Sequence, residues 1–109
     1  MASFTVERKK ERVVLAIEGR LTLEDKVRFD ACVAEQIADG TGIFAIDLSQ
    51  LEYVDSAGIG DLIKLKMQAA KSYRDVYVYG VSGEVERVFR VSGLNSVFTV
   101  IEQSEFEAL

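Results

Sequence analysis

The sequence contains no histidine, no proline and only one cysteine. Without histidine, a Ser-His-Asp triad, a Cys-His pair and an HExxH zinc site are all excluded, and with them most common hydrolytic mechanisms. The single thiol, that of Cys32, can form neither an internal disulfide nor a metal cluster of cysteines, and this usage fits a reducing compartment. We interpret Cys32 as a small buried or half-buried helix residue.

Positive charge is also scarce, because 13 Lys and Arg are opposed by 18 Asp and Glu, which gives a net charge of -5. Affinity for nucleic acid comes mainly from Lys and Arg that displace counterions from phosphates, so this balance argues against nucleic-acid binding and favours a basic partner. No apolar run approaches the roughly 18 residues that a membrane span requires, and residues 1–20 lack a signal-peptide pattern. We expect a cytoplasmic protein that binds neither nucleic acid nor membrane.

The overall amino-acid composition is typical of a folded domain. With 109 residues, of which 49% are apolar and 28% charged, the chain can bury one compact core and is too apolar for a disordered tail. No linker, repeat or low-complexity stretch divides it. We predict one domain over residues 1–109.

The first third of the chain changes from a strand period to a helix period. Apolar residues alternate at 4–6 and 13–17, which predicts two strands joined by the charged turn ERKKER. From residue 23 the apolar spacing becomes three and four, which predicts a helix that ends at Gly40. Its predicted apolar stripe consists of Leu23, Val27, Ala31, Ala34 and Ile37.

The middle of the chain predicts a buried strand followed by a second helix. The continuous apolar run IFAIDL, residues 43–48, is typical of a central strand covered on both faces. We interpret SQLEYVD, residues 49–55, as a loop, and the helix begins after it, at Ser56. The predicted apolar face of this helix consists of Ile59, Leu62, Ile63, Met67 and Ala70.

The last third predicts a strand at 76–81, a short helix closed near Gly93, a final strand at 96–102 and a terminal helical turn. Val85, Val88 and Phe89 form the inner side of the short helix. Because helices lie between the later strands, right-handed crossovers would make those strands parallel. We predict the α/β class, with a mixed four- to five-stranded sheet and interspersed helices packed on it.

The segment YVDSAGIG, residues 53–60, places a serine between an acid and small residues at the start of the second helix. The serine or the aspartate could cap the helix, which is worth about 1 kcal/mol. The hydroxyl could instead be a nucleophile, although without histidine only Lys64 or Lys66, two turns further on, remains as a base. It could also carry a phosphoryl group, which a helix N-terminus receives well.

Two glycines, Gly58 and Gly60, follow the serine closely. Each costs about 1 kcal/mol relative to alanine inside a helix, and a cap does not require them, so they favour a surface that a partner approaches closely. They also begin a GxGxxG pattern, but its third glycine is replaced by Ile63 and no GK[ST] element is present. Nucleotide binding is therefore the weaker alternative.

The stretch DLSQLEYVDSAGIG and the C-terminal FRVSGLNSVFTVIEQSEFEAL resemble the STAS domain of bacterial anti-sigma factor antagonists. The resemblance extends from the strand VLAIEGRL to the C-terminus, and its most specific parts are the DSxG[IL]G element and SGL-x-x-x-F at 92–98. It implies a single STAS domain in which Ser56 is the phosphorylation site. The partner-binding residues around it would be Asp55, Ala57, Gly58, Ile59 and Gly60.

What the resemblance implies is partner switching. The unmodified antagonist binds an anti-sigma factor that is also a serine kinase and so frees a sigma factor, phosphorylation by that kinase reverses the binding, and a phosphatase restores the serine. The kinase supplies ATP and Mg²⁺, so the chain would need no cofactor and would catalyse nothing. The alternative is a STAS subunit of another assembly, such as a stressosome-like scaffold or a lipid-transport complex, without a phosphate cycle.

Two further features concern partners. Many relatives carry an acid in a G-x-[LI]-D element, but here the segment is GRLT at 19–22, and the nearest acids are Glu24 and Asp25. Tyr77 and Tyr79 share one face of a predicted strand, where they serve either as amphipathic cover or as a dimer contact. We expect a monomer or a weak dimer.

Overall fold

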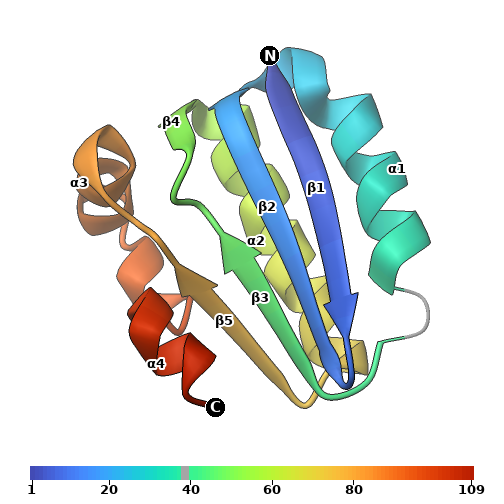
Figure 1. Ribbon diagram of the computed structural model, residues 1–109. Helices are drawn as coiled ribbons and strands as arrows, with labels where there is room; N and C mark the ends of the chain where they lie inside the picture. The colour runs from blue at the N-terminus through green and yellow to red at the C-terminus, as the bar shows by residue number, and fades with distance from the viewer. Residues whose placement is uncertain (38–39) are drawn as a thin grey trace.

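The computed structural model describes residues 1–37 and 40–109, and within them one sheet has five strands (Figure 1). These are β1 (Ala2–Lys9), β2 (Arg12–Leu21), β3 (Ile43–Asp47), β4 (Leu51–Val54) and β5 (Asp75–Tyr79). The order is β1-β2-β3-β5, and β4 pairs with the end of β2 beyond β3. β1 is antiparallel to β2, and the other pairings are parallel, so the predicted hairpin and mixed sheet are confirmed.

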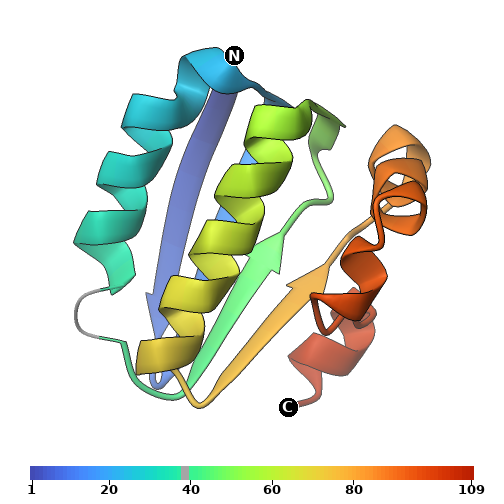
Figure 2. The ribbon, with the colours of Figure 1, turned by 180° about the vertical axis from the view of Figure 1, so that it is seen from behind.

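Helices cover the two faces of the sheet unequally. Helices α1 (Lys26–Ile37) and α2 (Ser56–Ser72) lie side by side on one face (Figure 2). The short helix α4 (Gln103–Glu107) packs on the opposite face, and α3 (Gly83–Val91) lies against β4. The 3-10 turns η1 (Leu23–Asp25) and η2 (Leu94–Ser96) precede α1 and follow α3. No helix in the described part of the chain is both long and apolar enough to cross a membrane.

The core has two parts because strand side chains alternate between the faces. Leu15 and Ile17 of β2 point toward α1 and α2 and belong to the larger cluster, together with Phe44 and Ile46 of β3. On the other face Tyr79 stacks on Phe106 of α4, with ring centroids 5.1 Å apart. The prediction that the strand at 43–48 is covered on both faces is therefore confirmed.

The first helix is present, but its predicted apolar stripe is wrong. Leu23 and Val27 are 65% and 82% exposed, and Ala31 is exposed as well. The buried side is made by Phe29 and Val33, four residues apart, because these larger side chains remove more apolar area from water than alanines do. Ala34 of the predicted stripe is also exposed. The side chain of Ile37 and residues 38–39, just before the predicted end at Gly40, lie outside the described residues.

The second helix begins at Ser56 as predicted, but its buried side is only partly the predicted one. Leu62 is buried, Ile59 and Ile63 are half-buried, and Met67 and Ala70 are exposed. The residues that face the sheet are Gly58, Leu62, Leu65 and Ala69. The predicted stripe thus runs along the flank and the outer surface of α2.

The predicted loop at 49–55 contains β4, so this part of the prediction is wrong. Leu51 and Val54 are buried, and β4 pairs in parallel with residues 19–21 of β2. Four residues are too few to establish a strand period in the sequence.

The predicted final strand at 96–102 is also wrong, because this segment makes one bridge, between Val78 and Val100, and no strand. Phe98 is buried beside Phe89 in the larger core, whereas Ile101 packs on the opposite face of the sheet. The segment therefore pairs with β5 at one point only, before α4 begins at Gln103. The predicted short helix, its inner Val85 and Phe89, and the terminal helical turn are confirmed.

Candidate functional site

Ser56 is the first residue of α2 and follows β4 directly. The buried side chain of Val54 and the pairing of β4 with β2 fix the chain up to this point. The N–H of Asp55 then donates to the carbonyl oxygen of Leu21 at 3.1 Å. The strand that the sequence did not reveal is therefore the element that holds the serine, whose side chain is exposed.

The N-cap of α2 is Asp55. Its Oδ1 accepts a hydrogen bond from the N–H of Gly58 at 2.8 Å, and its Oδ2 accepts one from the N–H of Leu23 at 3.1 Å. One carboxylate thus satisfies the helix terminus and joins it to η1. Because Asp55 caps the helix, capping does not account for Ser56, whose hydroxyl forms no hydrogen bond with another described residue.

The surroundings of Ser56 suit an anion. Beyond its N-cap Asp55, which takes the N–H of Gly58, the first turn of α2 contains no acidic residue, and the N–H groups at a helix N-terminus carry partial positive charge. Ser49 provides a contrast, since it is also exposed but donates its hydroxyl hydrogen to Asp47 at 2.7 Å. Of these two serines, only Ser56 has an uncommitted hydroxyl.

The two glycines of the motif have different surroundings. A Cβ on Gly58 would lie 2.6 Å from the carbonyl oxygen of Leu21 and 2.6 Å from Cγ2 of Val54, so the close approach at this glycine is made by the chain itself. A Cβ on Gly60 would meet no atom within 4 Å. Gly60 therefore lies on the open surface, whereas Gly58 lets α2 pack closely onto the sheet.

The structure places the predicted site residues at the N-cap and in the first two turns of α2, but exposes them to different degrees. Ser56 and Gly60 are exposed, Ala57 and Ile59 are half-buried, and Gly58 is buried. Ile59 also packs against the larger core. The surface around Ser56 is therefore formed mainly by one side of the helix terminus.

The acids near GRLT are not equivalent. Asp25 is fully buried and accepts hydrogen bonds from the N–H groups of Ala2 and Thr22, at 3.0 and 2.9 Å, and from Arg28. Burial alone would raise the pKa of the Asp25 carboxyl, but these hydrogen bonds hold the pKa below its ordinary value. Asp25 is thus a structural group, and Glu24 is the acid of the two that faces solvent.

Asp61 is a buried acid that sequence reasoning missed. It is 3% exposed, its Oδ1 accepts a hydrogen bond from Lys26 Nζ at 3.1 Å, and its Oδ2 has no partner among the described residues. This hydrogen bond and the charges of Asp61 and Asp30 raise the pKa of Lys26. The available signal was an aspartate directly beside Leu62 on the apolar side of the helix. The pair joins α1 to α2.

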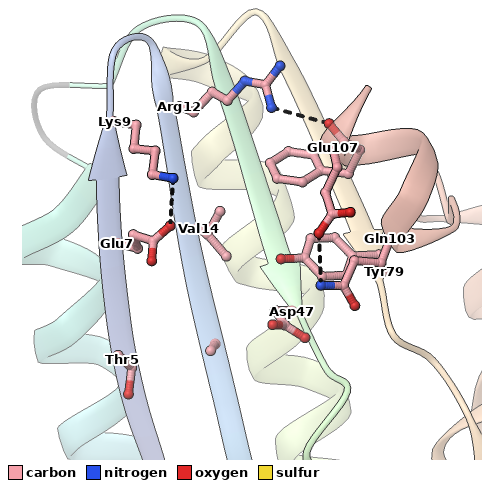
Figure 3. A pocket seen from close by; sticks show the side chains of 11 residues that line it. Thr5, Glu7, Lys9, Arg12, Val14, Asp47, Tyr79, Gln103 and Glu107 are labelled. Carbon is pink, nitrogen blue, oxygen red and sulfur yellow. Dashed lines mark hydrogen bonds and ion pairs between the residues drawn. The ribbon is translucent and has the colours of Figure 1, made fainter. Parts of the chain in front are cut away.

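A hollow of about 430 Å³ lies on the sheet face opposite α1 and α2, between β1 and α4 (Figure 3). Burial, together with the charge of Asp47, raises the pKa of Tyr79 to about 12, so its hydroxyl stays neutral. Tyr79 is buried under α4 and Tyr77 is half-buried, as expected for amphipathic cover. The polar groups of the hollow largely pair with one another, as in Lys9–Glu7, Gln103–Glu107 and Arg12 with the carbonyl of Phe106.

Cys32 is half-buried, as predicted, and burial and the charge of Glu35 raise the pKa of its thiol. A thiol with a raised pKa is a weak nucleophile at neutral pH. Among residues 1–37 and 40–109, no group of three or more His, Cys, Asp or Glu side chains is placed to hold a metal ion.

Several solved structures share this fold. An anti-sigma factor antagonist from Mycobacterium paratuberculosis superposes with a TM-score of 0.81 at 20% identity, covering 92% of this chain and 85% of that one. The anti-sigma factor antagonist SpoIIAA in its unphosphorylated form gives 0.74 at 22% identity, covering 94% and 91%. Its phosphorylated Bacillus form gives 0.60 at 17% identity, covering 97% of both chains. At these identities the similarity shows the fold.

Sequence comparison shows the family. The anti-sigma-B factor antagonist of Staphylococcus aureus (strain NCTC 8325) is 30% identical over 91 residues, which cover 84% of both chains. A family model described as "Mlab, STAS domain" matches residues 4–102. This match covers the sheet except for the first two residues of β1, together with α1 to α3 and the whole Ser56 site. The chain belongs to the STAS domain family.

Proposed function

We propose that this chain is an anti-sigma factor antagonist and that Ser56 is its switch. In the unphosphorylated form it binds an anti-sigma factor that is also a serine kinase, and a sigma factor is released. The name of the Staphylococcus aureus relative supports this role. Because sigma factors act with RNA polymerase, the proposal places the chain in the cytoplasm.

The observation that carries the proposal is the free, exposed hydroxyl of Ser56 at the start of α2, next to an aspartate that already caps the helix. In the phosphorylation step Ser56 Oγ forms a bond to the γ-phosphorus of ATP, the hydroxyl proton is lost and ADP leaves. The kinase brings ATP and Mg²⁺, so the antagonist contributes only the acceptor and the docking surface. A phosphatase returns the serine to its free form.

The neighbouring residues have separate roles in this proposal. Asp55 fixes the direction of the helix terminus, and Gly60 leaves the helix backbone open to the partner. Ala57 and Ile59 border this opening, half-buried. Gly58 acts from inside, because it allows α2 to approach Leu21.

Phosphorylation would weaken binding through the interface and leave the fold intact. A phosphoryl group adds about 1.5 to 2 negative charges, and an anion at a helix N-terminus is stabilised by about 0.3 to 1 kcal/mol. The charged group must lose its hydration in a complex, and this cost falls on the partner-bound state alone.

The family model is described as "Mlab, STAS domain" and names no anti-sigma factor, so it leaves room for a second candidate, a STAS subunit of another assembly such as a stressosome-like scaffold or a lipid-transport complex. In that case the same face of α2 would bind a partner without a phosphate cycle. Phosphorylation of Ser56 separates the two candidates.

The test is incubation of the chain with its cognate anti-sigma factor, ATP and Mg²⁺, followed by mass measurement and phosphopeptide mapping. We expect one phosphoryl group, on Ser56, and we expect Ser56→Ala to remain unmodified while still binding the anti-sigma factor. A label on Ser49 with Ser56 untouched would contradict the assignment. Stable binding to a different assembly without phosphorylation would favour the second candidate.

A further inference from the structure

The outer face of α2 continues the Ser56 site as an apolar line. Positions 56, 60, 63 and 67 are spaced by four, three and four residues, so their side chains lie along one side of the helix. Met67 is 60% exposed, Ile63 is half-buried, and Gly60 leaves open space. The core does not require Met67 at this place, because the buried side of α2 is made by other residues.

Three lysines, Lys64, Lys66 and Lys71, flank this line. None of them forms an ion pair with another described residue, whereas Lys26 pairs with two carboxylates. The one acid of the helix, Asp61, is buried. The exposed charge of α2 is therefore entirely positive, on a chain whose net charge is -5.

We propose that this lysine face of α2, made by Ile63, Met67 and the three lysines, receives an acidic amphipathic helix of the protein that docks at Ser56. The inference rests on the proposed function and adds the chemistry of the partner. Lys64 and Lys71 lie three residues before and four residues after Met67, so they border it on the same side of the helix. An apolar side chain of the partner would contact Met67, and carboxylates on its flanks would meet the lysines.

This arrangement matches the anatomy of protein interfaces. Methionine is enriched in interface cores because its flexible side chain adapts to a partner, whereas lysine is depleted there and is suited to the solvated rim. A helix that lies on another helix places anchors at three- and four-residue spacing, the spacing found here.

An anionic lipid surface is the other candidate with complementary charge, and the observations favour a protein. Lipid-binding basic segments usually carry about four to eight Lys and Arg in a cluster. Here three lysines are spread over two turns, and the remainder of an acidic chain would be repelled by an anionic membrane.

The lysine face also gives a reason why phosphorylation at position 56 would release such a partner. Lys64 lies eight residues from Ser56, about 12 Å along the helix and beyond the Debye length of about 8 to 10 Å, so a phosphoryl group would act on the near end of a bound acidic helix and not on the lysines themselves. A phosphoryl group would therefore add negative charge at one end of a surface that attracts an acidic helix.

The experiment measures affinity and association rate for the purified cognate anti-sigma factor. We expect Lys64→Glu/Lys71→Glu to lower the affinity at least about tenfold, mainly through the association rate, and raised salt to weaken wild-type binding. Lys10→Glu is the matched control, because Lys10 is an exposed lysine without an ion pair to a described residue and belongs to the β1–β2 hairpin, outside α2. We expect it to change the affinity less than about twofold.

A second pair of variants guards against misfolding. Lys64→Gln/Lys71→Gln removes the charge without reversing it and should give a smaller loss in the same direction, with an unchanged circular dichroism spectrum. Met67→Ser should weaken binding, whereas Gln68→Ser, an exposed neighbour, should not.

The outcomes separate the inference from the proposed function. If no anti-sigma factor binds the wild-type chain, the proposed function fails and the inference fails with it. If the wild type binds and the lysine variants bind equally well, the inference alone is overturned. Sedimentation with vesicles of anionic phospholipid, abolished by Lys64→Glu/Lys71→Glu, would overturn it in favour of a lipid surface.

Discussion

At the scale of single residues, Gly58 and Gly60 are two positions apart and face opposite surroundings. Gly58→Ala should lower the free energy of unfolding by about 1 to 3 kcal/mol, because its Cβ would press on the backbone carbonyl of Leu21. Gly60→Ala should raise it by about 0.5 to 1 kcal/mol, because alanine favours a helix and has free space there. Urea unfolding of both variants is the measurement, and equal effects would contradict the assignment of inside and outside.

The buried Asp25 makes the free energy of unfolding depend on pH at acidic values. Because its folded pKa lies below the ordinary value of 3.8, the carboxylate stabilises the fold at higher pH, and this contribution is lost as the pH falls below about 4. Asp25→Asn should cost about 1 to 3 kcal/mol at neutral pH and should flatten the loss of stability between about pH 5 and pH 3.

Chemical denaturation across this pH range measures both effects. Glu24→Gln is the matched control, since Glu24 is the exposed neighbour and should change neither the stability nor its slope appreciably. An Asp25→Asn variant with the pH dependence of the wild type would show that other carboxylates govern acid unfolding.

At the scale of elements, the terminus of α2 depends on Asp55 and not on Ser56. Asp55→Ala should lower the free energy of unfolding by about 0.5 to 2 kcal/mol and should speed hydrogen exchange at the amides of Gly58 and Leu23, which lose their acceptor. Ser56→Ala should change stability by a few tenths of a kcal/mol only. If both variants lost a similar free energy of unfolding, Ser56 would also act as a helix cap.

The elements also show how far the sequence specifies this fold. The hairpin, the buried strand β3, helix α3 and the helix start at Ser56 could be predicted, because each has a clear period or a clear boundary. The buried side of α1 could not be predicted, because the spacing of Leu23 and Val27 fits a helix face as well as the spacing of Phe29 and Val33 does. Packing against the sheet decides which of these two helix faces is buried.

Strand β4 and the segment after η2 escaped prediction for different reasons. β4 is too short for a period, and it exists because residues 19–21 of β2 extend beyond β3 and need a partner. Residues 97–101 are rich in β-branched and aromatic side chains, as a strand would be, yet the segment forms only the bridge between Val78 and Val100. Tertiary position, which no local pattern contains, decides both cases.

At the scale of the whole molecule, a charge at position 56 should leave the architecture unchanged. We expect Ser56→Asp to melt within a few degrees of the wild type and to shift amide resonances mainly in the first turns of α2 and the neighbouring loops. Its affinity for the anti-sigma factor should fall at least about tenfold, a loss of roughly 1.4 kcal/mol. A globally rearranged variant, or undiminished binding by genuinely phosphorylated protein, would contradict a surface mechanism.

The net charge of the whole chain and the charge of α2 point to different kinds of partner. A net charge of -5 favours a basic ligand, but the exposed charges of α2 are all positive. Composition gives the sum of the charges, whereas recognition depends on where the fold places them. The position of Ser56 at the helix start could be predicted from its motif. The grouping of the lysines around the exposed Met67 could be recognised only from the structure of α2.

The short pairing between β4 and β2 has a consequence for local unfolding. β2 is bonded along one edge to β1 and on the other to β3, and only its last residues form hydrogen bonds with β4, although Leu51 and Val54 also pack in the core. We expect β4 and the first turn of α2 to exchange their amide hydrogens through a local opening of lower free energy than global unfolding, while β1, β2, β3 and β5 stay protected. A kinase or phosphatase that binds the Ser56 hydroxyl in its active site would then need to displace only β4. The rest of the sheet would stay folded, and β4 could pair with β2 again afterwards.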